Sequence, residues 1–287
     1  MSKASIAGRN PSPAHIAGAA SMLLSGGLMF VRAEMAAVPL GLFVLACLAA
    51  PFLPRAGFFL PVISRGAGDR RAVSLTFDDG PDPDVTPGLL DLLDRHRLPA
   101  TFFVVGVEAK RHPALIREIL SRGHAVGNHS YHHDPLLMLR SRARLCGEIT
   151  RAQELLSGFG IRPRAFRPPV GITNPRLGGV LRTLDMDCIT FSCRAGDFGN
   201  RRIRGLAKGI LSRVRPGAVV LLHDVTPSGD GGIADWMEEM EQIVLGLKAK
   251  GYEVVPLSQL TGRPVMEPAT LPRSGAVPEI RKGPEEK

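Results

Sequence analysis

Aromatic residues are scarce in this sequence, where they make up 5% of 287 residues and include one tryptophan. There is no RNA-binding signature, no tandem basic-aromatic pattern and no zinc-finger spacing, so a nucleic-acid partner is not expected. The chain still carries a net charge of +9, because 36 Lys and Arg outnumber 27 Asp and Glu. That balance favours an anionic membrane face or a phosphorylated substrate, and its plainest interpretation is a basic surface beside a membrane.

Cysteine is also rare, and its spacing excludes two kinds of site. The four cysteines are Cys47, Cys146, Cys188 and Cys193. No two of them form a Cys-x-x-Cys pair, and together they form no disulfide framework. We therefore expect buried free thiols, which behave as small apolar side chains.

Charge is absent from two apolar runs near the N-terminus, residues 16–31 and 35–54, which Arg32 and Glu34 separate. The second run has about the length of a membrane span and the first is marginal, whereas a cleaved signal peptide has one shorter run. Residues 1–62 are therefore predicted to anchor the chain in a bacterial inner membrane. A single span would place the remainder outside if the basic N-terminus stays inside. A two-span hairpin would return it to the cytoplasm, where four arginines satisfy the positive-inside rule: Arg55, Arg65, Arg70 and Arg71.

Between residues 72 and 260, short β-branched or aromatic runs alternate with segments of helical periodicity. Glycine and proline mark the boundaries between them. About seven strand–helix units of this kind predict a parallel sheet with helices outside it. The count favours a distorted, closed or nearly closed (β/α) barrel over residues 63–261, with a doubly wound open sheet as the alternative. The tail, residues 262–287, is rich in proline and charge and is predicted to be disordered.

Two adjacent aspartates, Asp78 and Asp79, end the first predicted strand in the stretch AVSLTFDDGPDP. Neighbouring carboxylates repel each other unless a positive group or a metal lies between them. His129 and His133 follow a later strand at i and i+4, a spacing that lets both bind one metal on a helical turn. Two histidines and one carboxylate predict an open site for zinc or another divalent metal. The intervening His132 is expected at the surface or behind the ligands.

Polar residues near other strand ends suggest the remaining roles. If the second aspartate binds the metal, Asp78 is free to act as base toward a metal-bound water. Arg167 can supply the positive charge that keeps this carboxylate ionised. His223 ends a very apolar strand and suits a general acid, which needs an anionic partner. Asp197 is the first candidate for that partner and Asp224 the second.

These segments resemble the polysaccharide deacetylase family, also called the NodB homology domain or carbohydrate esterase family 4, over about residues 72–260. TFDDGP matches its first motif, HSYHH its H-[ST]-x-x-H motif, RPPVG its R-x-P-x-G motif and LLH its last motif. The resemblance implies a distorted (β/α) barrel and a sugar deacetylase. It assigns Asp78 as base, His223 as acid and Arg167 as the residue that orients the base. The implied metal ligands are Asp79, His129 and His133, and the implied substrate-binding residues are Pro169, Val170 and Leu221.

Two departures from the family pattern concern the substrate side of the site. Val170 stands where the R-x-P-x-G motif usually carries an aromatic residue, so that wall of the sugar subsite is missing. Its backbone N–H can still donate to an oxyanion, because every residue except proline has one. Cys193 occupies the first aspartate position of the fourth motif, of which only the end, Asp197 and Phe198, is kept.

The leading hypothesis is a metal-dependent hydrolase that removes acetyl groups, most often N-acetyl, from a sugar polymer or oligosaccharide. Zinc is the expected metal, with cobalt or nickel as alternatives. Two other hypotheses stay open: a deacylase of a lipid-linked sugar or another amide at the membrane face, and a non-catalytic carbohydrate-binding protein. An acetylated carbohydrate and a membrane are the expected partners, and the sequence leaves the oligomeric state undecided.

Overall fold

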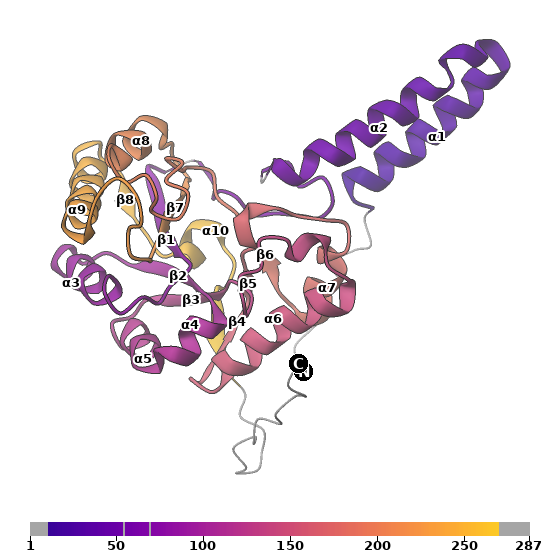
Figure 1. Cartoon of the computed structure of the whole chain (residues 1–287). Coiled ribbons are helices and arrows are strands. Elements are labelled where there is room, and N and C mark those ends of the chain that lie inside the picture. Colours follow the sequence, from indigo (N-terminus) through magenta and orange to yellow (C-terminus); the bar gives the residue numbers. More distant parts are fainter. Residues whose placement is uncertain (1–10, 54, 69, 270–287) are drawn as a thin grey trace.

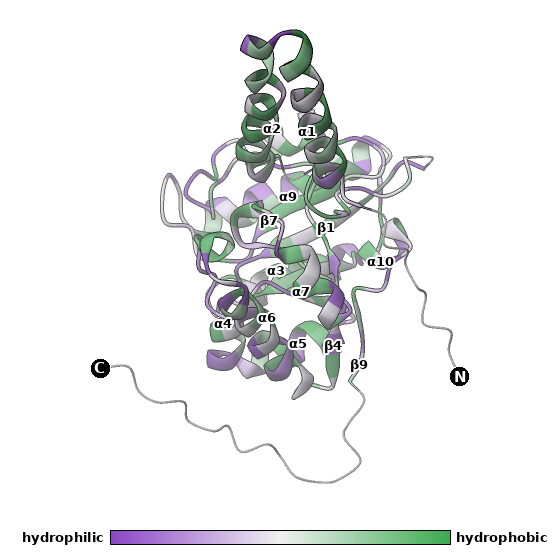
Figure 2. Cartoon of the chain, turned by 90° about the vertical axis from the view of Figure 1, so that its right-hand side faces the viewer, coloured by the Kyte–Doolittle hydropathy of each residue, from purple (hydrophilic) through white to green (hydrophobic). Residues whose placement is uncertain are grey.

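A computed structural model describes residues 11–53, 55–68 and 70–269, and it contains a barrel with a helical hairpin that projects from it (Figure 1). The hairpin consists of α1 (Pro13–Val31) and α2 (Ala37–Ala49), with the 3-10 turns η1 (Ala33–Met35) and η2 (Ala50–Phe52). Both helices are largely apolar along their length (Figure 2). The segments Pro13–Val31 and Ala33–Phe52 are long and apolar enough to cross a membrane, and only 11% and 6% of them is buried.

Both ends of this hairpin meet at the barrel. The backbone N–H of Ala14 donates to the carbonyl oxygen of Phe58 at 3.0 Å, so the start of α1 lies beside the segment that leaves α2. Ala50, Phe59 and Leu60 are buried in a cluster with residues of the barrel helices. The base of the hairpin is therefore part of a hydrophobic core rather than a separate appendage.

Seven strands form the main sheet, in the order β6-β5-β3-β2-β1-β7, and β8 pairs with the start of β1. All of these pairings are parallel. The sheet curls into a half-barrel, which confirms the predicted barrel class over the doubly wound alternative. The strands are β1 (Ala72–Asp78), β2 (Ala100–Val104), β3 (Ala125–Asn128), β5 (Ala165–Phe166), β6 (Asp187–Cys188), β7 (Val219–His223) and β8 (Glu253–Val254).

An irregular segment links the two edges of this curled sheet. After β6 the chain continues to Cys193, whose N–H donates to the carbonyl oxygen of Val219 at 3.2 Å and whose own carbonyl accepts from Leu221 at 2.9 Å. Ile63, which follows the hairpin, accepts from Thr190 at 2.9 Å. The linker between the apolar hairpin and the barrel is thus held by backbone hydrogen bonds to the sheet.

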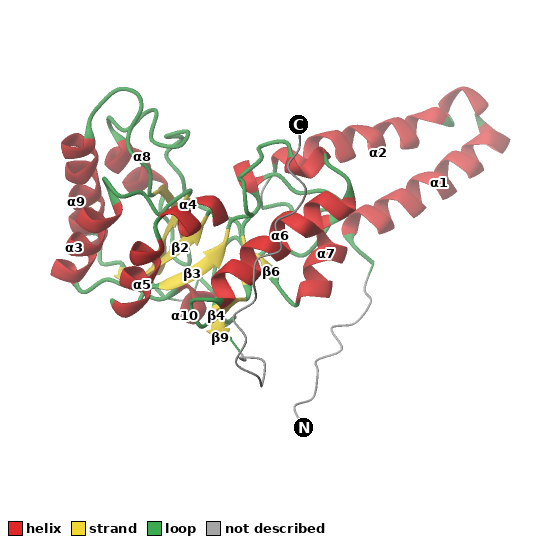
Figure 3. Cartoon of the chain, turned by 60° about the horizontal axis from the view of Figure 1, so that its bottom comes forward, coloured by secondary structure: helices red, strands yellow, loops and turns green. Residues whose placement is uncertain are grey.

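Helices cover the outside of the sheet (Figure 3). Apolar residues recur at helical spacing on their inner faces, as in α9, where Trp236, Met240, Ile243, Val244 and Leu247 are buried. The helices are α3 (Thr86–His96), α4 (Gly106–Arg111), α5 (Pro113–Ser121), α6 (Arg142–Ser157), α7 (Leu177–Leu184), α8 (Leu206–Arg213), α9 (Ile233–Ala249) and α10 (Leu257–Thr261), with 3-10 turns η3 (Leu137–Leu139) and η4 (Pro169–Gly171).

The predicted start of the disordered tail at residue 262 is wrong. Strand β9 (Met266–Pro268) pairs antiparallel with β4 (Ile161–Pro163), so the fold continues past that boundary. Met266 and Val265 also pack against buried residues of the core. The rest of the predicted tail, residues 270–287, lies outside the described part of the chain.

Candidate active site

Alternation along β1 places its polar side chains inside the barrel. Val73, Leu75 and Phe77 are buried in the cluster that packs the sheet against the helices. Thr76 and Asp78 therefore point to the opposite, inner face. Both are buried, and both receive a hydrogen bond from one guanidinium group of the R-x-P-x-G segment. The aspartate pair thus stands at the carboxyl end of a strand, where catalytic groups of (β/α) barrels gather.

Asp79 leaves the strand in the left-handed backbone region, with φ of 75°. This turn breaks the alternation directly after Asp78, so adjacent carboxylates can share one cavity. Nε2 of His129 lies 3.8 Å from Oδ2 of Asp78 and 3.3 Å from Oδ1 of Asp79. The two carboxylates therefore flank the same imidazole.

Asp79, His129 and His133 form a candidate metal centre, because their ligand atoms lie within 4.8 Å of one another. Nε2 of His133 is 3.2 Å from Oδ1 of Asp79. That oxygen is buried and accepts no hydrogen bond from any described residue. A buried carboxylate oxygen is costly to leave without a partner, and a divalent ion between these three residues would supply one.

The tautomer of His129 fits the same interpretation. Its Nδ1 donates to the carbonyl oxygen of Arg167 at 2.7 Å, which leaves the lone pair of Nε2 directed at the Asp79 carboxylate. Metal-binding histidines commonly donate their other ring nitrogen to a carbonyl in this way. The donor set of this chain therefore fits a divalent metal ion.

The pKa values of the three candidate metal ligands, Asp79, His129 and His133, depend on one another. Burial alone would raise the pKa of Asp79, but the imidazoles of His129, His133 and His223 outweigh it and hold that pKa well below its usual range. Burial lowers the pKa of His133, and the neighbouring His129 lowers it further. An ionised carboxylate beside a neutral His133 is the protonation state that a metal requires.

Arg167 is the cation that pairs with Asp78. Its Nη1 donates to Oδ1 of Asp78 at 2.6 Å and to Oγ1 of Thr76 at 2.8 Å. Nη2 donates to the carbonyl oxygen of Thr190 at 3.1 Å, and the guanidinium carbon lies 4.0 Å from the centre of the Phe103 ring. Burial lowers the pKa of Arg167, and the charge and hydrogen bond of Asp78 oppose that effect.

His223 and Asp197 form a second pair at the end of β7. Nδ1 of His223 lies 2.5 Å from Oδ2 of Asp197, which is buried. Burial by itself lowers the pKa of His223, but the hydrogen bond and charge of Asp197 raise it to about 9. Asp224, the second candidate partner, instead accepts a hydrogen bond from Oγ1 of Thr86 at 2.8 Å.

The structure also places the residues expected to contact a substrate. Pro169 and Val170 form the turn η4 that follows Arg167, and Val170 is exposed with φ of 52°. Leu221 is buried on the inner face of β7, in one cluster with Phe103 and Phe191. Of these two side chains, that of Val170 is therefore accessible to solvent and that of Leu221 is not.

Comparison with known proteins now identifies the family. The family described as polysaccharide deacetylase matches residues 65–189. A chitooligosaccharide deacetylase of Bradyrhizobium sp. is 33% identical over 216 residues, which cover 70% of this chain and 98% of the relative. The chain belongs to the polysaccharide deacetylase family.

Two further relatives support this assignment. A peptidoglycan-N-acetylglucosamine deacetylase of Listeria monocytogenes is 33% identical over 204 residues, covering 71% of this chain and 41% of that protein. A crystal structure of a peptidoglycan N-acetylglucosamine deacetylase matches with a TM-score of 0.64 at 29% identity and covers 71% of this chain and 94% of that one. Membership of the polysaccharide deacetylase family makes this chain a hydrolase of sugar N-acetyl amide bonds, a carbon–nitrogen bond that is not a peptide bond.

The structure shows where the residues of the altered fourth motif lie. Cys193 is buried between β7 and α8, and its Sγ lies 3.7 Å from the carbonyl oxygen of Ile210. Burial raises the pKa of this thiol to about 11, so it stays neutral and apolar. Phe198, at the end of the same motif, is exposed.

Thr76 and Glu148 lie at the site or beside it, although neither is among the site residues predicted from the sequence. Thr76 has the same parity in β1 as Asp78, so strand alternation alone predicts that it faces the same cavity. His132 turns away from the triad, and its Nδ1 lies 2.7 Å from Oε1 of the buried Glu148 in α6. No local pattern indicates Glu148, because the pairing joins two segments 16 residues apart.

Proposed function

We propose that this chain is a metal-dependent deacetylase of an N-acetylated amino sugar within an oligosaccharide or polymer. The arrangement of Asp79, His129 and His133 around a buried carboxylate oxygen that accepts no hydrogen bond is the observation that carries the proposal. Relatives with one third of their residues in common are named as deacetylases of chitooligosaccharides and of peptidoglycan N-acetylglucosamine. Zinc suits two imidazoles and one carboxylate best, with cobalt or nickel as substitutes.

A divalent ion bound to the triad would supply Lewis-acid chemistry, polarising the acetyl carbonyl and acidifying a water. Asp78 is assigned as the base that takes a proton from the attacking water, and its partner Arg167 holds it in place. His223 donates its proton to the departing nitrogen of the sugar, and Asp197 keeps its ring in position. Water and the amide thus give acetate and a free amine.

The turn η4 is assigned to the acyl group. The backbone N–H of Val170 is proposed to donate to the developing oxyanion, which any residue except proline can do. Leu221 is proposed to line the small apolar space for the acetyl methyl group, since it lies buried beside Phe103. Pro169 is proposed to fix the conformation of the turn, because its ring restricts φ.

Acetate release tests this function. The full chain, purified in detergent because the base of the hairpin shares a core with the barrel, would receive zinc, cobalt or nickel. Acetylated chitooligosaccharides, acetylxylan and peptidoglycan fragments would be the substrates. We expect metal-dependent release, reduced by about 100- to 10,000-fold in Asp78→Asn with its metal retained. Equal rates in both proteins would refute the assignment of the base.

A lipid-linked sugar is the second candidate substrate, and the hairpin favours it. Both ends of the hairpin meet at the barrel, where Ala14 bonds to Phe58. If both helices cross the membrane, the barrel lies on the same side as the N-terminus, and the arginines after α2 favour the cytoplasm. Reporter fusions at residue 60 would read the side directly, and a periplasmic signal would remove this candidate.

A further inference from the structure

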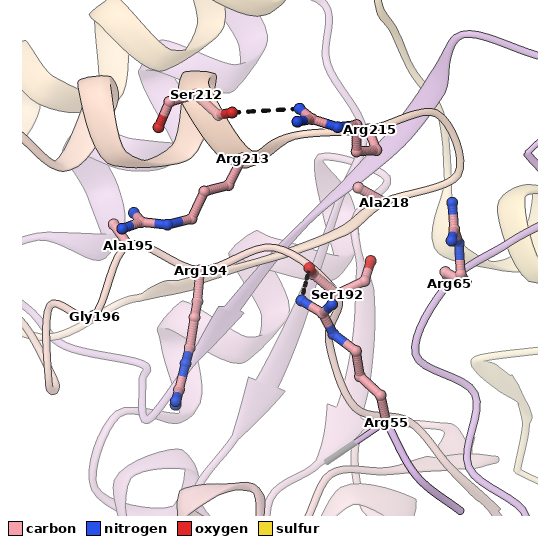
Figure 4. Close-up of a pocket in the computed structure, with 10 residues that line it drawn as sticks. All are labelled: Arg55, Arg65, Ser192, Arg194, Ala195, Gly196, Ser212, Arg213, Arg215 and Ala218. Carbon is pink, nitrogen blue, oxygen red and sulfur yellow. Dashed lines mark hydrogen bonds between the residues drawn. The ribbon is translucent and has the colours of Figure 1, made fainter. Parts of the chain in front are cut away.

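Five arginines line one cavity on the side of the barrel: Arg55, Arg65, Arg194, Arg213 and Arg215. The cavity has a volume of about 530 Å³, and its other lining residues are small or neutral. Figure 4 shows that the arginines come from three separate segments, namely the linker after α2, the loop after β6 and the end of α8. The clustering is therefore a product of the fold and not of a basic run in the sequence.

These guanidinium groups have no anionic partner in the described part of the chain. No carboxylate lines the cavity, and none of the five arginines forms an ion pair with a described aspartate or glutamate. All five are exposed. Like charges this close repel one another, so the cluster destabilises the free protein unless an anion binds between them.

Backbone carbonyls hold several of these side chains in position. Nη2 of Arg65 donates to Pro216 at 3.0 Å, Nη1 of Arg213 to Gly209 at 3.1 Å and Nη1 of Arg215 to Val214 at 2.8 Å. Each guanidinium has five N–H donors, so one such bond orients the group and leaves others for a ligand. Planar, oriented guanidinium groups suit the paired oxygens of phosphate.

The cavity lies next to the end of the second apolar helix. Phe52 ends η2, and Arg55 follows it by three residues, so their Cα atoms are at most about 11 Å apart. The side chain of Arg55 donates to the carbonyl oxygen of Ser192, which fixes this part of the linker against the cavity wall. On the opposite side, the wall formed by Arg194 to Gly196 runs directly into Asp197 of the candidate active site.

We propose that this arginine cavity binds the phosphate or diphosphate group of an anionic membrane lipid. The chemistry comes from the five arginines, and the position beside Phe52 favours a lipid over a soluble anion. The phosphate could belong to a phospholipid headgroup or to the carrier of a lipid-linked sugar, and the two sources share the same contacts. The proposal concerns binding alone and does not depend on the deacetylase reaction.

Calorimetry on the full chain in a neutral detergent tests the proposal. Metal would first be removed with a chelator, so that the candidate metal centre cannot bind the probes. The probes are inorganic diphosphate, farnesyl diphosphate and dihexanoyl phosphatidylglycerol. The pocket variant is Arg194→Gln/Arg213→Gln, and its control is Arg97→Gln/Arg263→Gln, two exposed arginines that do not line the cavity.

We expect at least one lipid probe to bind about tenfold more weakly to the pocket variant, and within about twofold of the native affinity to the control. Arg194→Lys/Arg213→Lys should recover only part of the loss, because lysine keeps the charge without the planar fork. Tighter binding of farnesyl diphosphate would identify a lipid carrier as the source, and tighter binding of phosphatidylglycerol a phospholipid.

Three results would overturn the proposal: no binding of any probe, equal weakening in pocket and control variants, or inorganic diphosphate binding as tightly as both lipids. Asp78→Asn, which should strongly reduce acetate release, is expected to bind the probes as the native chain does. A failure of the proposed function would therefore leave this result unchanged, and the two proposals can fail separately.

Discussion

Charged side chains are arranged in opposite ways in the candidate active site and in the arginine cavity. In the active site they are buried and matched, as Arg167 is by Asp78 and His223 by Asp197. In the cavity five arginines are exposed and unmatched among the described residues. The chain itself therefore supplies the counter-charges of the first set, whereas the proposed lipid phosphate would supply those of the second.

The largest expected effect concerns stability. Arg167→Met should lower the free energy of unfolding by about 3–5 kcal/mol, because it leaves the buried Asp78 carboxylate without its partner. Arg213→Met, in the cavity, should change it by less than about 0.5 kcal/mol, because that side chain is exposed and forms no ion pair with a described acidic residue. Urea unfolding of both variants measures the difference.

The double variant Arg167→Met/Asp78→Asn is the control for this interpretation. Removing both charges should restore most of the lost stability, since the penalty comes from the unpaired carboxylate. Similar losses of unfolding free energy in Arg167→Met and Arg213→Met would contradict this comparison. Burial and ion pairing would then not determine how much an arginine contributes to stability.

The next effect is on metal content. His133→Ala should reduce zinc affinity by more than the roughly 10- to 100-fold typical of losing an outer-shell partner, since it removes a ligand. His132→Ala is the matched control, because that neighbouring ring faces Glu148 instead of Asp79. Elemental analysis of both variants reads out the result, and full occupancy in His133→Ala would remove it from the ligand set.

A smaller effect is expected on the pH dependence of activity. His223 must be protonated to act as acid, and Asp197 raises its pKa to about 9 against the effect of burial. Activity should therefore fall as the pH rises through about 9. In Asp197→Asn the raised pKa is lost, so the fall should begin at lower pH and kcat/KM should be about tenfold lower near pH 8.

Profiles of kcat/KM against pH for the two proteins measure this shift. Asp134→Asn serves as the control, because Asp134 pairs with Arg140 at the surface and does not touch His223. An unchanged alkaline limb in Asp197→Asn would show that another group governs it, and the pairing at the end of β7 would then have a structural role only.

Strong local patterns made most of the fold predictable. The apolar spacing of α9 indicates a helix with one buried face. The alternation in β1 indicates a strand, and both faces of that strand are buried. The pairing of β4 with β9 gave no such signal, since each strand has three residues and ends in a proline. The insertion of Ile63 beside β6 depends on contacts between segments more than one hundred residues apart, which no periodicity reveals.

The residues of the candidate site that lie at strand ends could be predicted from the sequence. Asp78, His129 and His223 each stand at or next to the end of a strand, and parallel strands bring these ends together. The arginine cavity was not predictable, because its members lie between residues 55 and 215 in three segments. The sequence showed an excess of positive charge, and only the fold shows where it gathers.

The smallest expected effect tests the one exposed residue assigned to the active site. Val170 is 53% exposed and has φ of 52°, a conformation that a β-branched residue rarely adopts. Val170→Gly should therefore raise the free energy of unfolding by up to about 1 kcal/mol, since glycine adopts this region without steric cost. Val107→Gly in the first turn of α4 is the control and should lower it by up to about 1 kcal/mol, because glycine has a lower helix propensity than valine and a partly buried side chain is lost. A loss of stability in both variants would mean that the side chain of Val170 contributes packing that outweighs its backbone strain.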